Sequence, residues 1–488
     1  MKVFCCLFLF VMMLLASCTK RTFNEEPTSV LELGSDTLTF DTVFTTIGST
    51  TKRFTVKNPY AHYLRISNVV LAGGESSNFR ININGAAVLE TSDYELAPGD
   101  SMYIFAEVTV DPNQEALPFL IKDSVLFTTN GNQQKVLLVA YGQNAHYFNS
   151  EVIGDTVFSN DKPYLIYNSI LVDSGKTLYI EPGCRLYFHK NSRLYIQGTL
   201  IAAGTVEEPI IFTNDRLESS YRETAGQWDG LHFLKGGHES YLGHCIIENS
   251  VVGVRVDSLP ELGDGILEYN TRPALYDSFT VIPNVLIENT TIRNISASGI
   301  LGLTAAIEGK NMLVYNCGQN NVQLEFGGYY DFDFCTFANY PTNASVQHRK
   351  PILRFGNYFE SSEGVQVSAV ANASFSHTII HGSLDDEIEL DSINIEGADF
   401  TYSFDYSLIK YKDQIFDSTK FSNVFEGIPS FENYMEDNYR LDSSSQLINA
   451  GNKSQTNDVI QSGLEFDLDG FTRMSGTSSD IGAFERQQ

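Results

Sequence analysis

Basic residues are scarce in this sequence. Its 488 residues include 32 Lys and Arg against 60 Asp and Glu, which gives a formal net charge of -28 at pH 7. This charge argues against nucleic acid as a partner, and it disfavours anionic polymers unless a local basic patch or bound calcium intervenes.

Cysteine is also scarce. Four of the seven cysteines lie beyond residue 18, and their wide spacing does not match a zinc site: Cys184, Cys245, Cys317 and Cys335.

Long hydrophobic runs are missing except at the N-terminus. The run from Val3 to Leu15 follows Lys2, and it is too short for a comfortable permanent membrane span. A charged start followed by a short apolar run is typical of a secretory signal peptide. We therefore predict that residues 1–17 are a signal peptide and that the body of the protein is soluble.

A short motif follows this run directly. Leu15-Ala16-Ser17-Cys18 resembles the lipobox of bacterial lipoproteins. The resemblance implies that the Cys18 thiol receives a diacylglycerol and that the membrane becomes a partner through this anchor. At roughly 0.8 kcal/mol per buried methylene, several acyl chains make the attachment practically permanent. Lys20 after the cysteine is compatible with an outer-membrane address, at the cell surface or on the periplasmic face. The charged, proline-containing residues 18–30 predict a flexible tether.

Residues 31–145 predict an antiparallel β-sandwich. Stretches with period-two alternation, such as Met102 to Val108, are separated by turns such as Asn130-Gly131-Asn132. The run from Phe54 to Asn58 and the turn from Leu96 to Ser101 resemble immunoglobulin-like domains of the ASH and MSP type, as does Thr129-Asn130. Those domains mostly bind partners or space other domains.

Residues 150–488 contain a repeat that predicts a right-handed parallel β-helix. Short segments end in Asn249, Asn294, Asn316 and Asn339, at intervals of 45, 22 and 23 residues. Two looser segments end at His381 and Lys410. The residue two positions earlier is always apolar, which indicates one inward position per coil: Ile247, Ile292, Val314, Phe337, Ile379 and Leu408. By the same alternation, Cys245, Thr290, Met312 and Cys335 should also point inward, the two cysteines as free thiols.

Several motifs in this region resemble the pectin-lyase-like superfamily of β-helix proteins. They include Leu194 to Gly204 and the "W-x-G-hydrophobic" coil at Trp228. Asp467 to Gly470 and Asp480 to Glu485 resemble the terminal segment of secreted β-helix proteins, and we interpret them as a C-terminal capping segment. Asp467 and Asp469 would begin a calcium loop, but the sequence lacks the remaining ligands of an EF-hand. Tight-turn chemistry is the favoured explanation, and we predict no cofactor and no metal.

The resemblance leaves an enzyme as one alternative. Many pectin-lyase-like proteins are polysaccharide lyases or glycoside hydrolases, which use clustered carboxylates or calcium with a basic residue. None of their signature strings is present, so the catalytic residues are unknown. The densest acidic cluster, Asp385-Asp386-Glu387 with Glu389 and Asp391, is interpreted as a solvated loop.

Better candidates for ligand contact are three long insertions between coils, because loops that leave one corner of a β-helix can wall a groove. The first spans residues 214–227, the second 259–283 and the third 341–351. Aromatic rings offer flat faces to sugars, and Arg offers forked donors. The candidate residues are Arg216, Tyr221, Arg222, Tyr269, Arg272, Tyr276, His348 and Arg349. The alternative is that they only pin the loops to the rod.

Two classes of function follow from the sequence. The favoured one is a non-catalytic binding or scaffold module of the cell envelope, whose partner is a polysaccharide or an envelope protein. The other is a lyase or glycosidase. We favour the first because a function must be assigned from a site, and no catalytic site is complete.

Overall fold

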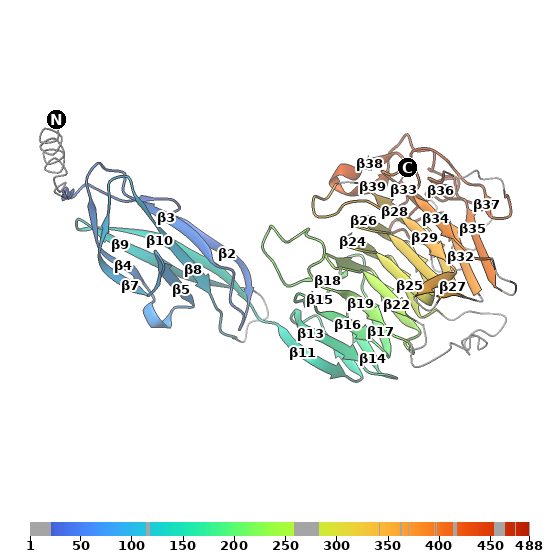
Figure 1. The fold of residues 1–488 in the computed structure, drawn as a ribbon, viewed down its shortest axis with the longest axis horizontal. Coiled ribbons are helices and arrows are strands. Elements are labelled where there is room, and N and C mark those ends of the chain that lie inside the picture. The colour runs from blue at the N-terminus through green and yellow to red at the C-terminus, as the bar shows by residue number, and fades with distance from the viewer. Residues whose placement is uncertain are drawn as a thin grey trace, which may run out of the picture. The chain divides into compact units, whose positions relative to one another are not determined.

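The computed structural model describes most of the chain in two compact units, residues 1–144 and 145–488, each of which is considered by itself (Figure 1). The described residues are 21–113, 118–257, 283–340, 342–361, 364–368, 370–394, 396, 398–412, 417–452, 464–473 and 475–487. The structure is all-β, as the sequence predicted.

The first unit is a sandwich of two five-stranded sheets. Strand pairs are antiparallel except for the parallel pair β2–β10. One sheet has the order β1 (Glu32–Leu33), β3 (Lys52–Lys57), β8 (Ser101–Val108), β5 (Phe79–Ile83), β6 (Ala86–Ala87); the other has the order β2 (Thr37–Phe44), β10 (Asn132–Gln143), β9 (Phe119–Thr129), β4 (Leu64–Leu71), β7 (Glu90–Leu96).

The sandwich core follows from alternation along the strands. In β8, Met102, Ile104 and Ala106 are buried, while Tyr103 points outward and is 41% exposed. Phe54 and Phe127, from opposite sheets, meet edge to face at 6.2 Å in the core. Period-two patterning therefore predicted this unit well.

Residues 21–30 are attached to the sandwich. The Asn24 amide donates to the Tyr63 carbonyl at 2.8 Å, and the Arg65 guanidinium lies 4.7 Å from the centre of the Phe23 ring. The Asn130 side chain donates to the Asn24 carbonyl at 2.9 Å. The predicted flexible tether over 18–30 was therefore wrong for this stretch, because backbone and ring contacts hold it.

The second unit is a parallel β-helix built around one 25-stranded sheet. Its strands form three parallel ladders that run along the stack. The first ladder contains β11 (His146–Ile153), β13 (Tyr164–Val172), β15 (Arg185–Phe188), β18 (Ile210–Asn214), β21 (Cys245–Glu248), β24 (Thr291–Ile295), β26 (Leu313–Cys317), β28 (Thr336–Asn339), β33 (Ile379–Gly382) and β36 (Leu408–Ile409).

The long strands β11 and β13 bend at a bulge and also begin the second ladder. This ladder continues through β16 (Arg193–Ile196), β19 (Gly230–Phe233), β22 (Val254–Asp257), β25 (Ile300–Lys310), β27 (Val322–Asp333), β29 (Leu353–Gly356) and β34 (Ile388–Asp391).

The third ladder shares the C-terminal halves of β25 and β27. Its other strands are β12 (Thr156–Phe158), β14 (Thr177–Ile180), β17 (Thr199–Ala203), β20 (Ser240–Gly243), β23 (Val285–Glu288), β32 (Val370–Ser376), β35 (Asp399–Asp405) and β37 (Phe421–Ser422). A hairpin of β30 (Tyr358–Ser361) and β31 (Gly364–Val367) leaves the stack.

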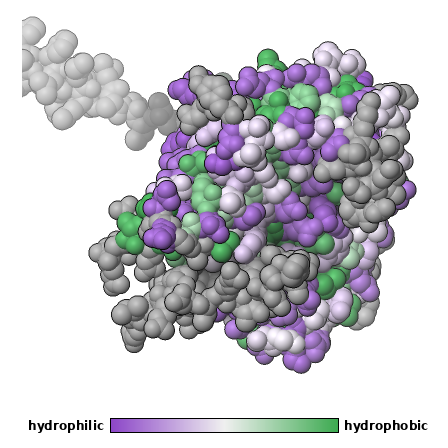
Figure 2. Space-filling model, turned by 90° about the vertical axis from the view of Figure 1, so that its right-hand side faces the viewer, coloured by the Kyte–Doolittle hydropathy of each residue, from purple (hydrophilic) through white to green (hydrophobic). Residues whose placement is uncertain are grey.

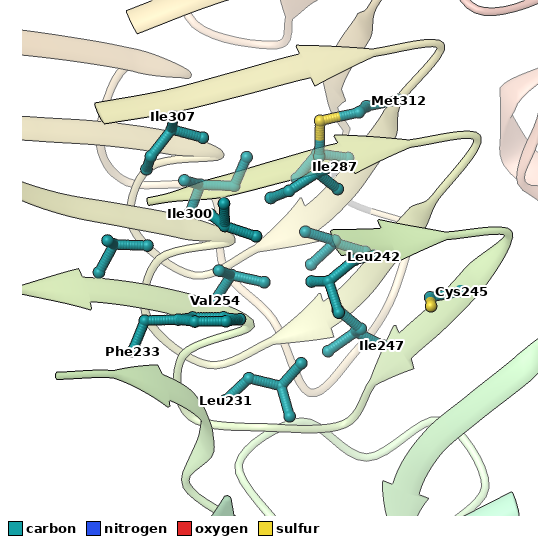
Figure 3. Close-up of a cluster of buried hydrophobic side chains, with 14 of the residues drawn as sticks. Leu231, Phe233, Leu242, Cys245, Ile247, Val254, Ile287, Ile300, Ile307 and Met312 are labelled. Atoms are coloured by element: carbon teal, nitrogen blue, oxygen red, sulfur yellow. The ribbon is translucent and has the colours of Figure 1, made fainter. Parts of the chain in front are cut away.

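Equivalent apolar side chains of successive coils pile up inside the helix (Figure 3). The predicted inward positions Ile247, Ile292, Val314 and Phe337 are all fully buried in this core. Cys245 and Cys335 are buried free thiols, and Thr290 and Met312 are buried between them, as predicted.

Asparagine forms the bends after the first ladder. Asn249, Asn294 and Asn316 have φ of 63°, 55° and 52°, a left-handed conformation that Asn tolerates better than most residues. The Asn316 side-chain amide donates to the side-chain carbonyl of Asn294 one coil away at 3.4 Å. The predicted stacking of asparagines therefore includes this pair.

The predicted register was wrong for the last two coils of the first ladder. Phe337 pairs with Ile380, and Ile380 pairs with Ile409, so these residues point inward. Ile379 and Leu408 point outward instead, into a separate apolar cluster. A slip of one residue exchanges the two faces of a strand.

That outer cluster is covered by the C-terminal strap, which we define as the described residues 426–452, 464–473 and 475–487. The strap contains the hairpin of β38 (Phe431–Asn433) and β39 (Asn438–Leu441), joined by a 3-10 turn at Tyr434–Glu436. Its Gly482 amide donates to the His377 carbonyl at 2.8 Å, and Tyr439 packs on Tyr315 at 4.9 Å. Figure 1 shows β38 and β39 beside β28 and β33. The strap therefore runs along the flank of the rod, and the predicted role of an end cap was wrong for it.

Candidate ligand-binding cleft

A cleft of about 630 Å³ lies between the C-terminal strap and the last coils of the first ladder. Its size is typical of sites for small ligands. The rod contributes Tyr340, His381, Ile409, Lys410 and Tyr411; the strap contributes Glu426, Gly427, Ile428, Pro429, Ser430, Phe431 and Tyr434.

Aromatic rings form one wall of the cleft. Tyr340 follows β28, and its ring stacks on Tyr434 of the strap with centroids 4.3 Å apart. Phe431 meets Tyr340 edge to face at 6.4 Å. Tyr434 remains 38% exposed, so part of its ring is open to solvent. Flat, partly exposed rings of this kind suit sugar faces.

Polar groups of the rod complete the cleft. His381 lies in β33, and its Nδ1 is 2.7 Å from the hydroxyl of Tyr340. Burial lowers the pKa of His381 to about 4, and the charge of Lys410 acts in the same direction, so the imidazole is neutral at pH 7. The Lys410 ammonium donates to the Gly382 carbonyl at 3.0 Å.

A smaller hollow of about 300 Å³ is lined by other residues of the first ladder and of the strap. Its Arg293 donates to Glu248 at 2.7 Å and to the Tyr315 hydroxyl at 3.2 Å. Its Arg440 forms two hydrogen bonds with Asp469, at 2.6 and 2.7 Å. Both guanidinium groups are thus engaged within the protein, so this hollow is the weaker candidate.

Two of the three candidate residues of the first insertion, Arg216 and Tyr221, contact one another. The Arg216 guanidinium binds Glu218 at 3.1 Å and lies 4.1 Å from the centre of the Tyr221 ring. These contacts fit the alternative in which the residues pin the loop. Arg222 is exposed at the surface.

The third insertion contains a buried candidate and an exposed one. His348 Nε2 lies 3.2 Å from a carboxylate oxygen of Glu387, and both side chains are almost completely buried. Arg349 is exposed and donates to Gln347 at 2.9 Å. Ser345 donates to the Glu223 carbonyl at 3.2 Å, so the first and third insertions meet.

The second insertion carries Tyr269, Arg272 and Tyr276, which lie outside the described residues. It connects β22 to β23, whereas the other two insertions connect the first ladder to the second. The three insertions therefore do not leave one corner of the helix. No candidate residue of the first or third insertion lines the 630 Å³ cleft, and a ligand role for all eight candidates stays a prediction.

The acidic cluster is more structured than a solvated loop. Glu387 is fully buried and accepts a hydrogen bond from the Leu384 amide at 2.8 Å. Glu389 and Asp391 lie in β34 and bind Arg354, which also donates to Glu325 at 2.6 Å. The interpretation as a solvated loop was wrong for these three carboxylates, because each has a partner within the protein.

Asp467 and Asp469 take part in a turn and an ion pair. Asp467 accepts hydrogen bonds from the amides of Asp469 and Phe471 at 3.0 and 2.7 Å, as a tight turn requires, and Asp469 binds Arg440. Within the described ranges, no group of three His, Cys, Asp or Glu is placed to hold a metal ion. The same residues include no helix of the length and hydrophobicity that a membrane crossing requires.

Comparisons with known proteins give little further information. No protein-family model matches the sequence. A stretch is 27% identical over 169 residues to the Drosophila melanogaster protein bark beetle, covering 27% of this chain and 5% of that protein. The chain thus spans only a small fraction of the length of this relative.

Solved structures with partial likeness include three proteins. A family 123 glycoside hydrolase from Clostridium perfringens is 10% identical, with 24% of this chain and 30% of that chain covered and a TM-score of 0.18. PapD-like domain 7 of human CEP192, an ASH domain, is 10% identical, with 26% of this chain and 94% of that chain covered and a TM-score of 0.17. The Vibrio cholerae protease VesB is 14% identical, with 23% of this chain and 31% of that chain covered and a TM-score of 0.17. At such scores, the likeness carries no argument about function.

Sequence reasoning missed the cleft residues. A signal was present, because two repeat segments end in His381 and Lys410 where the others end in asparagine. Tyr434 had no comparable signal. It reaches Tyr340 only because the strap folds back along the rod.

Proposed function

We propose that this protein is a lipid-anchored module of the cell envelope that binds glycan without cleaving it. The observation that carries the proposal is the aromatic cleft, which is lined by the partly exposed ring of Tyr434 and by the neutral His381. Rings that stack on sugar faces, with a few hydrogen-bond donors for orientation, are the usual elements of a glycan site.

The environment of the carboxylates supports binding over hydrolysis. A glycosidase needs two carboxyl groups across the scissile bond, one of them kept protonated. In the acidic cluster, Glu389 and Asp391 both bind the guanidinium of Arg354, so both carboxyl groups are engaged within the protein. The remaining parts of the proposal come from sequence: acylation of Cys18 and sorting to the outer membrane.

The test is a binding screen of the full chain, purified in detergent, against neutral and acidic polysaccharides. Tyr434→Ala should weaken binding of the best ligand roughly tenfold, or about 1.4 kcal/mol, which lies within the roughly 1–3 kcal/mol expected of an aromatic contact. Tyr147→Ala is the matched control, because Tyr147 is 50% exposed on β11, outside the cleft.

Two results would contradict the proposal. New reducing or unsaturated ends that appear during the screen would show that the protein is a hydrolase or a lyase. Binding that survives Tyr434→Ala but is lost in the double variant Arg272→Ala and Tyr276→Ala would move the site to the second insertion.

A further inference from the structure

The hydrogen-bond donors of the cleft indicate which kind of sugar it takes, an inference that rests on the proposed function. The Tyr340 hydroxyl has one hydrogen-bond partner among the described residues, Nδ1 of His381. Burial raises the pKa of Tyr340, so the phenol keeps its proton. A phenol that donates to Nδ1 leaves the imidazole proton on Nε2.

His381 therefore has a remaining donor at Nε2, for which the described part of the chain supplies no partner. Lys410 adds further donors. Its ammonium carries three N–H groups, and one of them is used by the Gly382 carbonyl. Both side chains line the cleft, so the rod side of the cleft offers donors to a ligand.

The hydrogen-bond donors of His381 and Lys410 lie in the same cleft as the aromatic rings. Such a cleft favours a ligand group that only accepts hydrogen bonds and that also has an apolar part. An acetamido group fits both requirements, because its carbonyl oxygen accepts from N–H groups and its methyl group packs on rings. A sugar hydroxyl fits less well, since it must also place its own proton.

A uronate carboxylate would accept equally well, but the charge distribution opposes it. The chain carries a formal net charge of -28, and the strap side of the cleft contributes the carboxylate of Glu426. Lys410 is the one cation among the described residues that line the cleft. We propose that the cleft selects a neutral glycan with N-acetylated amino sugars, whose acetamido carbonyl receives the free donors of His381 and Lys410.

Isothermal titration of the full chain with three hexasaccharides tests this inference. The probes are β-1,4-linked N-acetylglucosamine, β-1,4-linked glucose of the same backbone, and oligogalacturonate. We expect the N-acetylated probe to bind at least tenfold more tightly than the glucose probe, and oligogalacturonate to bind most weakly.

Variants of His381 distinguish the effect of its N–H donor on binding from the effect of its ring shape. His381→Phe should reduce the preference for the N-acetylated probe to less than about threefold, whereas His381→Gln, which keeps an N–H donor, should retain part of it. Tyr434→Ala should weaken both neutral probes to a similar extent. Fluorescence of Trp228, which is fully buried in the rod, checks that each variant is folded. Lys410→Met provides a second test of the donors should His381→Phe not fold.

The outcomes separate this inference from the proposed function. Equal binding of the two neutral probes, with loss in Tyr434→Ala, would overturn the acetamido preference and leave the glycan site intact. Tightest binding of oligogalacturonate would also overturn it. If glycan binding is absent, or is indifferent to Tyr434→Ala, the proposed function itself fails.

Discussion

Stability of the β-helix should fall between pH 5 and pH 8 because of a buried carboxyl group in the strap. Glu485 is 5% exposed and accepts a hydrogen bond from the Asp480 amide at 2.8 Å. Burial, together with the nearby charge of Asp480, raises the pKa of Glu485 from 4.5 to about 8. The fully buried Arg473 opposes this shift without cancelling it.

The sign follows from proton linkage. Because the folded pKa lies above the unfolded one, the folded state holds an extra proton between about pH 4.5 and 8. The free energy of unfolding should therefore fall by about 1.4 kcal/mol per pH unit across that window, up to roughly 5 kcal/mol in total. Burial also raises the pKa values of Asp467 and Asp480, which act in the same direction.

The assay is denaturant unfolding followed by Trp228, the single tryptophan of the chain, at several pH values. Its ring stacks on Phe188 at 4.2 Å inside the rod, so its fluorescence reports on the β-helix and not on the sandwich. Glu485→Gln imitates the protonated carboxyl group, so this variant should lose most of the pH dependence and exceed the wild type in stability above pH 8.

The matched control is Glu436→Gln, an exposed glutamate of the same strap, which should behave like the wild type. A wild-type stability that stays flat from pH 5 to 8 would refute the reasoning. So would a Glu485→Gln variant that keeps the full pH dependence.

Three further predictions concern cysteines and an asparagine of the chain. A peptide map under non-reducing conditions should show Cys245 and Cys335 as free thiols, because two coils lie between them and a disulfide spans only about 4–7 Å between Cα atoms; a linked pair would contradict the ladder register. Cys18→Ala should release the protein from membranes, because its thiol is the expected lipid acceptor, and a mutant found in the membrane pellet at wild-type levels would disprove the anchor. Asn316→Ala should destabilise the β-helix by about 2–4 kcal/mol, because alanine is less tolerant than asparagine of the left-handed φ of 52° and because the hydrogen bond from Thr342 is lost. Asn316→Gly should recover about 1 kcal/mol of this loss, because glycine adopts that φ without strain. Equal stability of the two variants would argue against backbone strain.

The sequence by itself determined the architecture of both units. Alternation predicted the sandwich, and the recurrence of asparagine two residues after an apolar position predicted the coils around Ile247, Ile292 and Val314. These signals succeed because they are local. A left-handed bend favours Asn, which tolerates that conformation better than most residues, and an inward position needs an apolar residue in every coil.

The register of the last coils was decided by tertiary structure. Ile379 and Ile380 are both apolar, and alternation alone cannot say which of them points inward. The strap settles the choice, because it gives Ile379 an apolar environment outside the rod. Alternation of apolar and polar residues along a strand predicts which face is buried only where the other face is exposed to water.

The candidate cleft depends in the same way on packing between distant parts of the chain. His381 and Lys410 stood out in the repeat, but their chemistry comes from Tyr340 beside the imidazole and from Tyr434, whose ring stacks on Tyr340. Tyr434 reaches them because the outward apolar residues of the first ladder, such as Leu313 and Ile379, bury themselves under the strap. Burial of that surface is a property of the whole fold, and no local signal in the sequence records where the strap comes to lie.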